Sequence, residues 1–168
     1  HRKRRPINGA FIAISLADLM QQSEDERAAQ AMAIKQRVQE LHEHFGIAHL
    51  LITTVHAYTA SQSIMDKPTR KRRRGRAGAL SMIPTSTGAA KATAQVLPEL
   101  AGKMDGMAIR VPVPDGSVVD LTCWHPRPVT PEEINGALAA ACAGPLAGLI
   151  HYETEPIVSS DVLMSTYS

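Results

Sequence analysis

The segment from Ile52 to Lys91 constrains the fold more than any other part of the sequence. It opens with ITTVHAYT, a run rich in β-branched and aromatic residues, which predicts a strand with His56 near its end. It closes with SMIPTSTGAAKATAQVL, in which Pro84 and the cap-type residues Ser86 and Thr87 precede good helix formers. We therefore expect a strand, a loop and the entrance to a helix within one continuous stretch.

The predicted helix, residues 88–97, would place an anion-binding site close in sequence to an imidazole. Gly88 has no side chain to keep a ligand away from the backbone. The free N–H groups and the dipole at a helix start attract negative charge. An imidazole, hydroxyl groups and an anion cradle in one segment favour a phosphorylated substrate.

Capping and turn signals predict the other elements. Ser23 and Glu26 form a capping box, Thr130-Pro131 opens another helix, and residues 114–116 suggest the turn of a hairpin. We predict an α+β fold with a mixed, largely antiparallel sheet and helices packed on one face. The expected helices are 23–45, 88–97 and 131–143, and the expected strands are 50–58, 107–113, 117–125 and 150–158.

Composition limits the class of protein. At 168 residues and 44% hydrophobic, the chain can bury one core, or at most two small ones. No run approaches the roughly 20 apolar residues of a membrane span, so no membrane partner is expected. Cys123 and Cys142 have neither metal-site nor disulfide-framework spacing, which predicts no metal and suits a reducing compartment such as the cytoplasm. Cys123 shares one face of its strand with apolar residues and is expected in the core.

Four long motifs follow one another along the chain: VHAYTASQ, RRRGRAGALSMIPTSTGAAKA, GMAIRVPVPDGSVVDLT and EEINGALAAACAGPLAGLIHYETEPIVSSD. In this order they resemble the catalytic, C-terminal domain of glyceraldehyde-3-phosphate dehydrogenase, and the likeness runs from about Leu41 to Asp161. The resemblance implies that residues 23–168 are part of such a catalytic domain. Residues 1–22, basic and then apolar, remain unassigned.

Two charged or titratable residues would carry the chemistry. The resemblance implies that His56 is the base that keeps a cysteine ionised and shuttles the proton during hydride transfer, although a histidine at a strand end is more often structural. Arg110 lies in an apolar strand and needs an anionic partner, because an unpaired buried guanidinium is costly. The resemblance makes that partner a phosphate, and Asp115 and Asp120 are the alternatives.

The resemblance also implies two phosphate positions. The substrate phosphate would be held by Thr59 and Arg110, with Ser61 at a position that the family usually fills with threonine. Inorganic phosphate would be bound by Thr87 and Gly88. The expected small-molecule partners are therefore a sugar phosphate or inorganic phosphate.

The sequence departs from the family at the nucleophile. Counting back without gaps from HEHFGI places Ala29 at the position of the catalytic cysteine, and no cysteine occurs in residues 1–122. By resemblance, we also expect this chain to lack the family's dinucleotide-binding domain, its final strand and its C-terminal helix. NAD is therefore a cofactor by resemblance only, its binding residues are unassigned, and we do not expect the chain alone to bind it or to act as a dehydrogenase.

A basic loop follows the predicted strand. Residues 61–76 contain seven basic side chains: Lys67, Arg70, Lys71, Arg72, Arg73, Arg74 and Arg76. By resemblance this loop approaches the cofactor site across a subunit interface. It could also be a solvated loop or a nucleic-acid patch, although it has no interleaved aromatic residues for base stacking. The alternative to a catalytic-domain function is thus a structural or interaction module whose basic loop binds an acidic or nucleic-acid partner.

Residues 1–22 would take the place of the family's last strand and C-terminal helix in covering the hydrophobic core. A sheet without the family's last strand and helix would expose an edge and apolar area. The apolar residues of this segment are expected to dock on the exposed core: Phe11, Ile12, Ile14, Leu16 and Leu19. Otherwise, a second copy or another chain is expected to cover it.

Overall fold

The computed structural model describes residues 12–14, 24–87, 93–95, 97–163, 165 and 167. In chain order, the main elements are β1 (Ile12–Ile14), α1 (Glu24–Phe45), β2 (His49–Ala57), β3 (Ile83–Ser86), β4 (Met104–Val111), β5 (Ser117–Trp124) and α3 (Pro131–Ala143). Short 3₁₀ helices are η1 (Arg72–Gly75), η2 (Pro98–Leu100) and η3 (Ser159–Val162).

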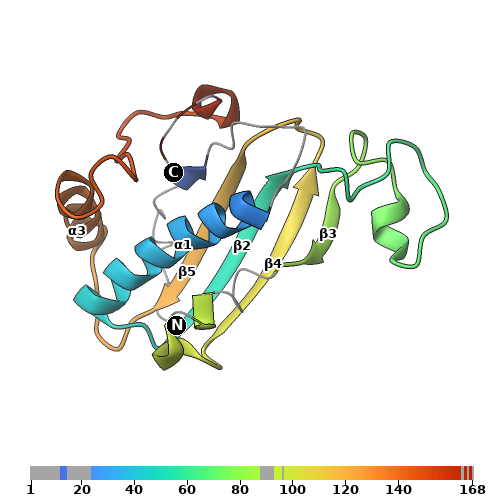
Figure 1. The fold of residues 1–168 in the computed structure, drawn as a ribbon. Coiled ribbons are helices and arrows are strands. Elements are labelled where there is room, and N and C mark those ends of the chain that lie inside the picture. The colour runs from blue at the N-terminus through green and yellow to red at the C-terminus, as the bar shows by residue number, and fades with distance from the viewer. Residues whose placement is uncertain are drawn as a thin grey trace, which may run out of the picture.

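The strands form one sheet in the order β1-β5-β2-β4-β3 (Figure 1). β2 and β4 are parallel, whereas the other neighbouring pairs are antiparallel. The predicted α+β fold with a mixed, largely antiparallel sheet is therefore confirmed. Three expected strands occur as β2, β4 and β5, with ends shifted by up to three residues.

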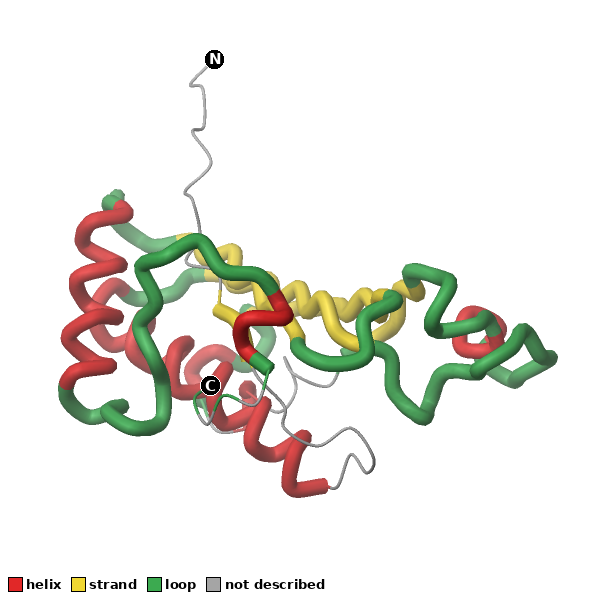
Figure 2. The backbone as a smooth tube through the Cα atoms, turned by 90° about the horizontal axis from the view of Figure 1, so that it is seen from above, coloured by secondary structure: helices red, strands yellow, loops and turns green. Residues whose placement is uncertain are grey.

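The helices cover one face of the sheet. α1 runs across the strands, and α3 packs against α1 at the end of this layer (Figures 1 and 2). Because side chains alternate along a strand, Leu50 and Ile52 are buried under α1, whereas Leu51 points the other way and is 45% exposed. The core joins α1, β2, β5 and the turn around η2: Ile34, Val38, Leu41, Ile47, Leu50, Ile52, Leu97, Leu100 and Val119.

Both long helices start where the sequence predicts. The Thr130 hydroxyl accepts a hydrogen bond from the Glu133 N–H, and the Glu133 carboxylate accepts one from the Thr130 N–H, which completes a capping box before Pro131. α1 covers 24–45 of the predicted 23–45, and its predicted cap Ser23 lies outside the described residues.

The predicted hairpin of 107–113 with 117–125 is wrong, because β2 lies between β4 and β5. The loop between them crosses the end of β2, where the Ala57 N–H donates to the Gly116 oxygen and the Tyr58 N–H donates to the Val113 oxygen. The last N–H groups of β2 are therefore satisfied by the crossing loop.

A strand also stands where a helix entrance was expected. Residues 83–86 form β3, which pairs with β4 and places Pro84 opposite Ile109. β3 is the last strand of the order, and an edge position tolerates a proline that cannot donate. Of the predicted helix 88–97, residues 93–95 are helical, Leu97 is not, and the others lie outside the described residues.

The strand predicted at 150–158 is absent from this described segment, which is irregular up to η3. The Glu153 carboxylate accepts hydrogen bonds from the Thr154 and Glu155 N–H groups, and such local bonds compete with sheet pairing. Ile150 is buried, but in a small cluster with Ala141 and Leu146 beside α3.

Part of the unassigned N-terminal segment does join the fold. β1 pairs with β5 in the register Ile12↔Val119 and Ile14↔Ser117. The predicted positions Phe11, Leu16 and Leu19 lie outside the described residues. Among the helices that the structure describes, none has the length and apolar character needed to cross a membrane.

Candidate functional site

The parallel pairing of β2 and β4 places His56 directly beside Arg110. Both strands run in the same direction, so their carboxyl ends lie side by side at the same end of the sheet. The Arg110 Nη1 lies 2.7 Å from the His56 Nδ1 and 2.9 Å from the Ala57 oxygen. The structure thus brings together the two residues that the sequence singled out for chemistry, although they are 54 positions apart.

The His56 ring is buried, with 4% of the residue exposed. Its Nδ1 also lies 2.8 Å from the Ala57 oxygen. A guanidinium can only donate, so a hydrogen bond from Arg110 requires a lone pair on Nδ1 and leaves the ring proton on Nε2. In this tautomer the Ala57 oxygen is satisfied by Arg110 rather than by the ring.

Burial, followed by the charge of Arg110, lowers the pKa of His56 to about 4. The Ala57 carbonyl and the Asp115 carboxylate oppose this shift without cancelling it. The imidazole is therefore neutral at neutral pH, and the positive charge of this pair resides on Arg110.

Acidification from about pH 7 to about pH 5 should destabilise the fold through His56 by about 2 kcal/mol. The folded-state pKa of about 4 lies below the ordinary 6.5, so the unfolded state binds more protons in that window and stability falls as the pH falls through it. Urea unfolding at both pH values measures the effect. His56→Gln should lose this part of the pH dependence, whereas His49→Gln, at the exposed end of the same strand, should keep it. An identical pH dependence in wild type and H56Q would contradict the assignment.

The loop after β2 joins two of the predicted hydroxyl groups. Thr59 Oγ1 lies 2.9 Å from Ser61 Oγ and donates to Gln62 Oε1 at 3.0 Å. Gln62 Nε2 in turn donates to Ser61 Oγ at 3.0 Å, and Gln62 Oε1 accepts from the Thr59 N–H. Gln62 is buried and holds both hydroxyls in place, yet only its place at the end of the VHAYTASQ motif marked it in the sequence.

Thr87 lies further along the sheet. β3 runs antiparallel to β4, so Ile83 is opposite Arg110 and Ser86 is opposite Met107. The Thr87 methyl group consequently lies over Gly106, four residues or about 13 Å along β4 from Arg110. The structure therefore does not bring Thr87 next to the His56–Arg110 pair, and Gly88 lies outside the described residues.

Neither cysteine lies beside His56. Cys123 is opposite Leu50, six residues or about 20 Å along β2 from His56, and it packs against the core as predicted. Burial raises the pKa of the Cys123 thiol to about 11, and burial also raises that of Cys142. Ala29, at the expected position of the nucleophile, lies in α1. The described residues hold no cluster of three side chains suited to a metal ion.

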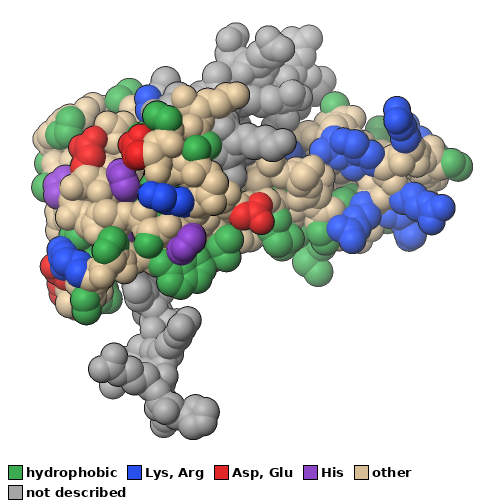
Figure 3. Space-filling view, turned by 90° about the horizontal axis from the view of Figure 1, so that it is seen from below, with side chains coloured by type: hydrophobic (Ala, Val, Ile, Leu, Met, Phe, Trp, Pro, Cys, Tyr) green, Lys and Arg blue, Asp and Glu red, His purple; other side chains and the backbone are tan. Residues whose placement is uncertain are grey.

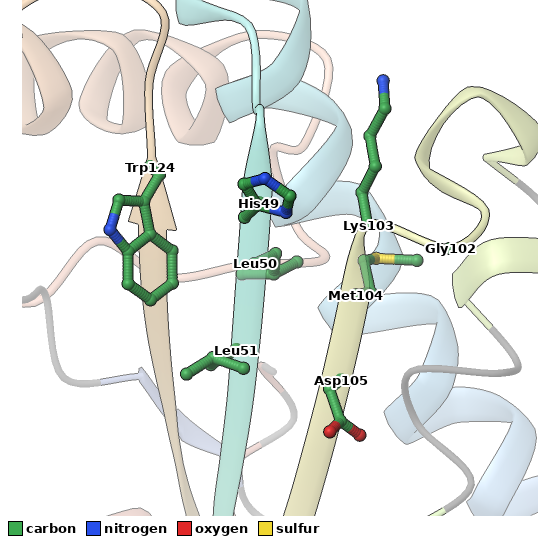
Figure 4. A pocket seen from close by; sticks show the side chains of 8 residues that line it. All are labelled: His49, Leu50, Leu51, Gly102, Lys103, Met104, Asp105 and Trp124. Atoms are coloured by element: carbon green, nitrogen blue, oxygen red, sulfur yellow. The ribbon is translucent and has the colours of Figure 1, made fainter.

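A shallow pocket of about 360 Å³ lies at the other end of β2. It opens on the sheet face away from α1, and side chains of three adjacent strands line it, among them Leu51, Asp105 and Trp124 (Figure 4). His49 at this pocket is seven residues from His56, about 23 Å along the strand. The pocket and the His56–Arg110 pair are therefore separate features.

Comparison with known proteins places these features in a family. Residues 29–168 match the family model described as glyceraldehyde 3-phosphate dehydrogenase, C-terminal domain. The chain is 52% identical over 128 residues to a glyceraldehyde-3-phosphate dehydrogenase of Mycolicibacterium smegmatis and 56% identical over 128 residues to that of Geobacillus stearothermophilus. In both alignments, 76% of this chain is covered.

The aligned region spans 38% of the length of these two relatives. A similar match, 56% identity over 130 residues, covers 39% of the glyceraldehyde-3-phosphate dehydrogenase of Borreliella burgdorferi. The family model covers most of the chain and includes every described element from β2 to η3. The chain therefore belongs to the family of glyceraldehyde 3-phosphate dehydrogenase C-terminal domains.

Proposed function

We propose that this catalytic domain of glycolytic type binds phosphate or a sugar phosphate at the end of β2 and does not oxidise the aldehyde by itself. The observation that carries the proposal is the pairing of His56 with Arg110 at the carboxyl ends of two parallel strands. A guanidinium offers a fork of N–H donors that matches phosphate oxygens. The Thr59 and Ser61 hydroxyls, linked by Gln62, supply further hydrogen bonds on the loop that follows β2.

The same arrangement suggests how an anion would prepare His56 as a base. When phosphate draws the Arg110 Nη1 away, the imidazole proton can shift from Nε2 to Nδ1 of His56. Nδ1 then donates to the Ala57 oxygen at 2.8 Å. The lone pair on Nε2 becomes available to accept a proton. Thr87 and Gly88 would serve a second phosphate position away from this pair.

The residues of this chain do not fit a nicotinamide cofactor. A dinucleotide site needs a glycine-rich turn of the G-x-G-x-x-G kind between a strand and a helix, and the sequence has no such pattern. We therefore propose that NAD, the cofactor implied by the family, is not bound by these residues alone. Because both cysteines are free, we assign the domain to a reducing compartment, the cytoplasm.

No NAD-dependent oxidation of glyceraldehyde 3-phosphate above background is expected at micromolar protein. A thiolate is the nucleophile of this reaction in the family, and Ala29 stands at its expected position. Steady-state formation of NADH, followed by its absorbance, tests this. Turnover that His56→Ala abolishes would contradict the proposal of an inactive domain.

Phosphate binding is expected in the millimolar range, worth only about 4 kcal/mol, because Arg110 is the single cation of the pair and His56 is neutral. In an NMR titration with inorganic phosphate, amide signals of Thr59 and Ser61 should move in wild type and stay in place in Arg110→Ala. Arg127→Ala, which breaks an exposed ion pair with Glu133, is the matched control and should titrate like wild type. Unchanged wild-type spectra at tens of millimolar phosphate would refute the site.

We further propose that the uncovered face of the sheet forms an interface with a second copy or another chain. Leu51, Met107 and Trp124 on this face are each at least 40% exposed. Light scattering across a concentration series would reveal the assembly, and a strict monomer would contradict it.

A second candidate function is that of an interaction module without catalysis. The observation that favours it is the exposure of the basic loop, in which Lys67, Arg70, Lys71, Arg72, Arg73 and Arg76 all face solvent. Such a surface attracts polyanions. Retention on heparin that falls when loop arginines are replaced would support this function.

A further inference from the structure

Charged groups act on His56 from two elements of the described structure. β4 contributes Arg110, whose Nη1 lies 2.7 Å from the His56 Nδ1. Residues 112–116, here called the crossing loop, pass over the end of β2 and contribute Asp115, whose carboxylate favours a protonated ring. β5 places the buried Ser117 opposite His56, which adds a hydroxyl but no charge. His56 is therefore under the influence of a cation and an anion that oppose each other.

Hydrogen bonds hold Asp115 beside the end of β2. On either side of it along the chain, the Val113 oxygen accepts the Tyr58 N–H and the Gly116 oxygen accepts the Ala57 N–H. The Asp115 Oδ1 accepts the Gly116 N–H at 2.6 Å. Gly116 has a φ of +86°, which residues with a side chain rarely adopt, so the turn depends on glycine here. The crossing loop therefore fixes the place of the carboxylate relative to β2.

Asp120, the other acidic candidate from the sequence, does not share this position. It lies opposite Thr53 in the register of β5 with β2, whereas Ser117 lies opposite His56. Because side chains alternate along a strand, Asp120 and His56 are on opposite faces of the sheet. Asp120 is also exposed to solvent. Of these two aspartates, Asp115 is the one placed to influence an anion at the His56–Arg110 pair.

An anion on Arg110 would change the electrostatic balance at His56. In the free site, burial and the guanidinium charge together keep the imidazole neutral. A bound sulfate or phosphate brings negative charge against the guanidinium and cancels its repulsion of a second cation. With Nδ1–H donating to the Ala57 oxygen, Nε2 can accept a proton from solvent, and Asp115 stabilises the resulting imidazolium. The occupied site therefore has a higher affinity for a proton than the free site.

We propose that the site binds its anion together with a proton, and that Asp115 is the positioning residue that makes His56 the acceptor of that proton. This inference rests on the proposed phosphate site and adds its regulation by pH. Since the occupied site binds more protons than the free one, anion affinity rises as the pH falls. Asp115 has a second effect, because its own charge repels an anion at neutral pH. Together these effects keep anion binding weak at neutral pH and strengthen it on acidification.

An NMR titration of the full chain with sulfate at pH 7 and pH 5 tests the proposal, because sulfate keeps both charges over this range. The His56 pKa of about 4 keeps the free ring mostly neutral at both pH values. A sulfate that cancels half of the lowering from the ordinary pKa of about 6.5 should bind about 2.5-fold more tightly at pH 5. One that cancels all of it should bind about 20-fold more tightly. At pH 5, the ring nitrogen signals of His56 should move toward imidazolium when sulfate is added.

Asp115→Asn keeps the oxygen that accepts the Gly116 N–H and removes only the charge. It should bind sulfate about 2-fold more tightly at pH 7 and gain less affinity than wild type on acidification. Asp120→Asn removes the same charge from the opposite face and should behave like wild type at both pH values. His56→Gln should lose most of the rise in affinity between pH 7 and pH 5.

Sulfate held by other cations must be told apart from the site. Residues 61–76 carry seven basic side chains, which gather beyond the β3 edge (Figure 3). Arg110→Ala provides the baseline, because shifts that persist in this variant do not come from the proposed site. Far-ultraviolet circular dichroism at each pH verifies that every variant is folded.

The outcomes separate the proton coupling from the phosphate site. Equal sulfate affinity at pH 5 and pH 7, with binding lost in Arg110→Ala, would overturn the coupling and leave the phosphate site standing. Binding that does not depend on Arg110 at either pH would overturn both. A rise in affinity that persists in His56→Gln would assign the proton to another group. Identical behaviour of Asp115→Asn and Asp120→Asn would overturn the role of Asp115.

Discussion

Removing residues 1–22 is expected to lower the melting temperature by about 4–12 °C and to promote aggregation. The deletion takes away β1, whose three residues pair with β5 between Ser117 and Val119. Two or three backbone hydrogen bonds, each worth about 1 kcal/mol, would be lost. The freed edge of β5 would present unpaired N–H and C=O groups, which can recruit another chain.

The matched control is a deletion of residues 1–10, which removes the basic start of the chain and keeps β1. It should leave the melting temperature within experimental error of wild type. Differential scanning calorimetry combined with light scattering compares the three proteins. A Δ1–22 protein that keeps the assembly state and the melting temperature of the wild type would show that β1 contributes nothing to the sheet.

Ile52→Ala should reduce the free energy of unfolding by about 3–5 kcal/mol. Ile52 is 0% exposed beneath α1 in the main core, so the truncation loses buried methyl groups and leaves a cavity. Since β2 also carries His56 at its far end, a loosened strand should weaken phosphate binding as well. Urea unfolding monitored by circular dichroism provides the measurement.

Leu51→Ala is the control on the same strand. Leu51 is the adjacent residue, is of similar size and lies on the uncovered face at 45% exposure. Its truncation should cost the monomer less than about 1 kcal/mol. Similar losses for both variants would mean that the two faces of β2 are equally covered, which would point to an assembled interface on the open face.

The sequence alone predicted several elements because their signals are local. The capping box at Thr130 and the proline that follows it define the start of α3, and that helix ends where predicted, at Ala143. Ile34, Val38 and Leu41 recur at the three-to-four-residue spacing of one helix face, and these apolar residues are the ones that α1 buries. The long motif around His56 identified the family, because a match over many consecutive residues can be recognised without the three-dimensional structure.

Only the tertiary structure decided how the strands are ordered. The residues of β4 and β5 read as a hairpin, yet β2 separates them, because the loop 112–116 crosses the end of β2 and accepts its last N–H groups. Nothing in the two strand sequences encodes that pairing. The strand at 83–86 was not predicted from the sequence for a related reason. Pro84 is compatible with a strand only at the edge of a sheet, and the order of the whole sheet decides which strand lies at the edge.

The sequence also determined the residue types of the site, whereas the fold determined their relations. His56, Arg110, Thr59 and Ser61 were predictable as an imidazole, a cation and two hydroxyls. The contact of His56 with Arg110, and with it the pKa of about 4, arises from the parallel register of two strands 54 residues apart. The same register leaves Thr87 about 13 Å along β4 from Arg110. Charge, hydrogen-bonding capacity and shape belong to each residue, but their coupling depends on distance and burial, which only the folded chain fixes.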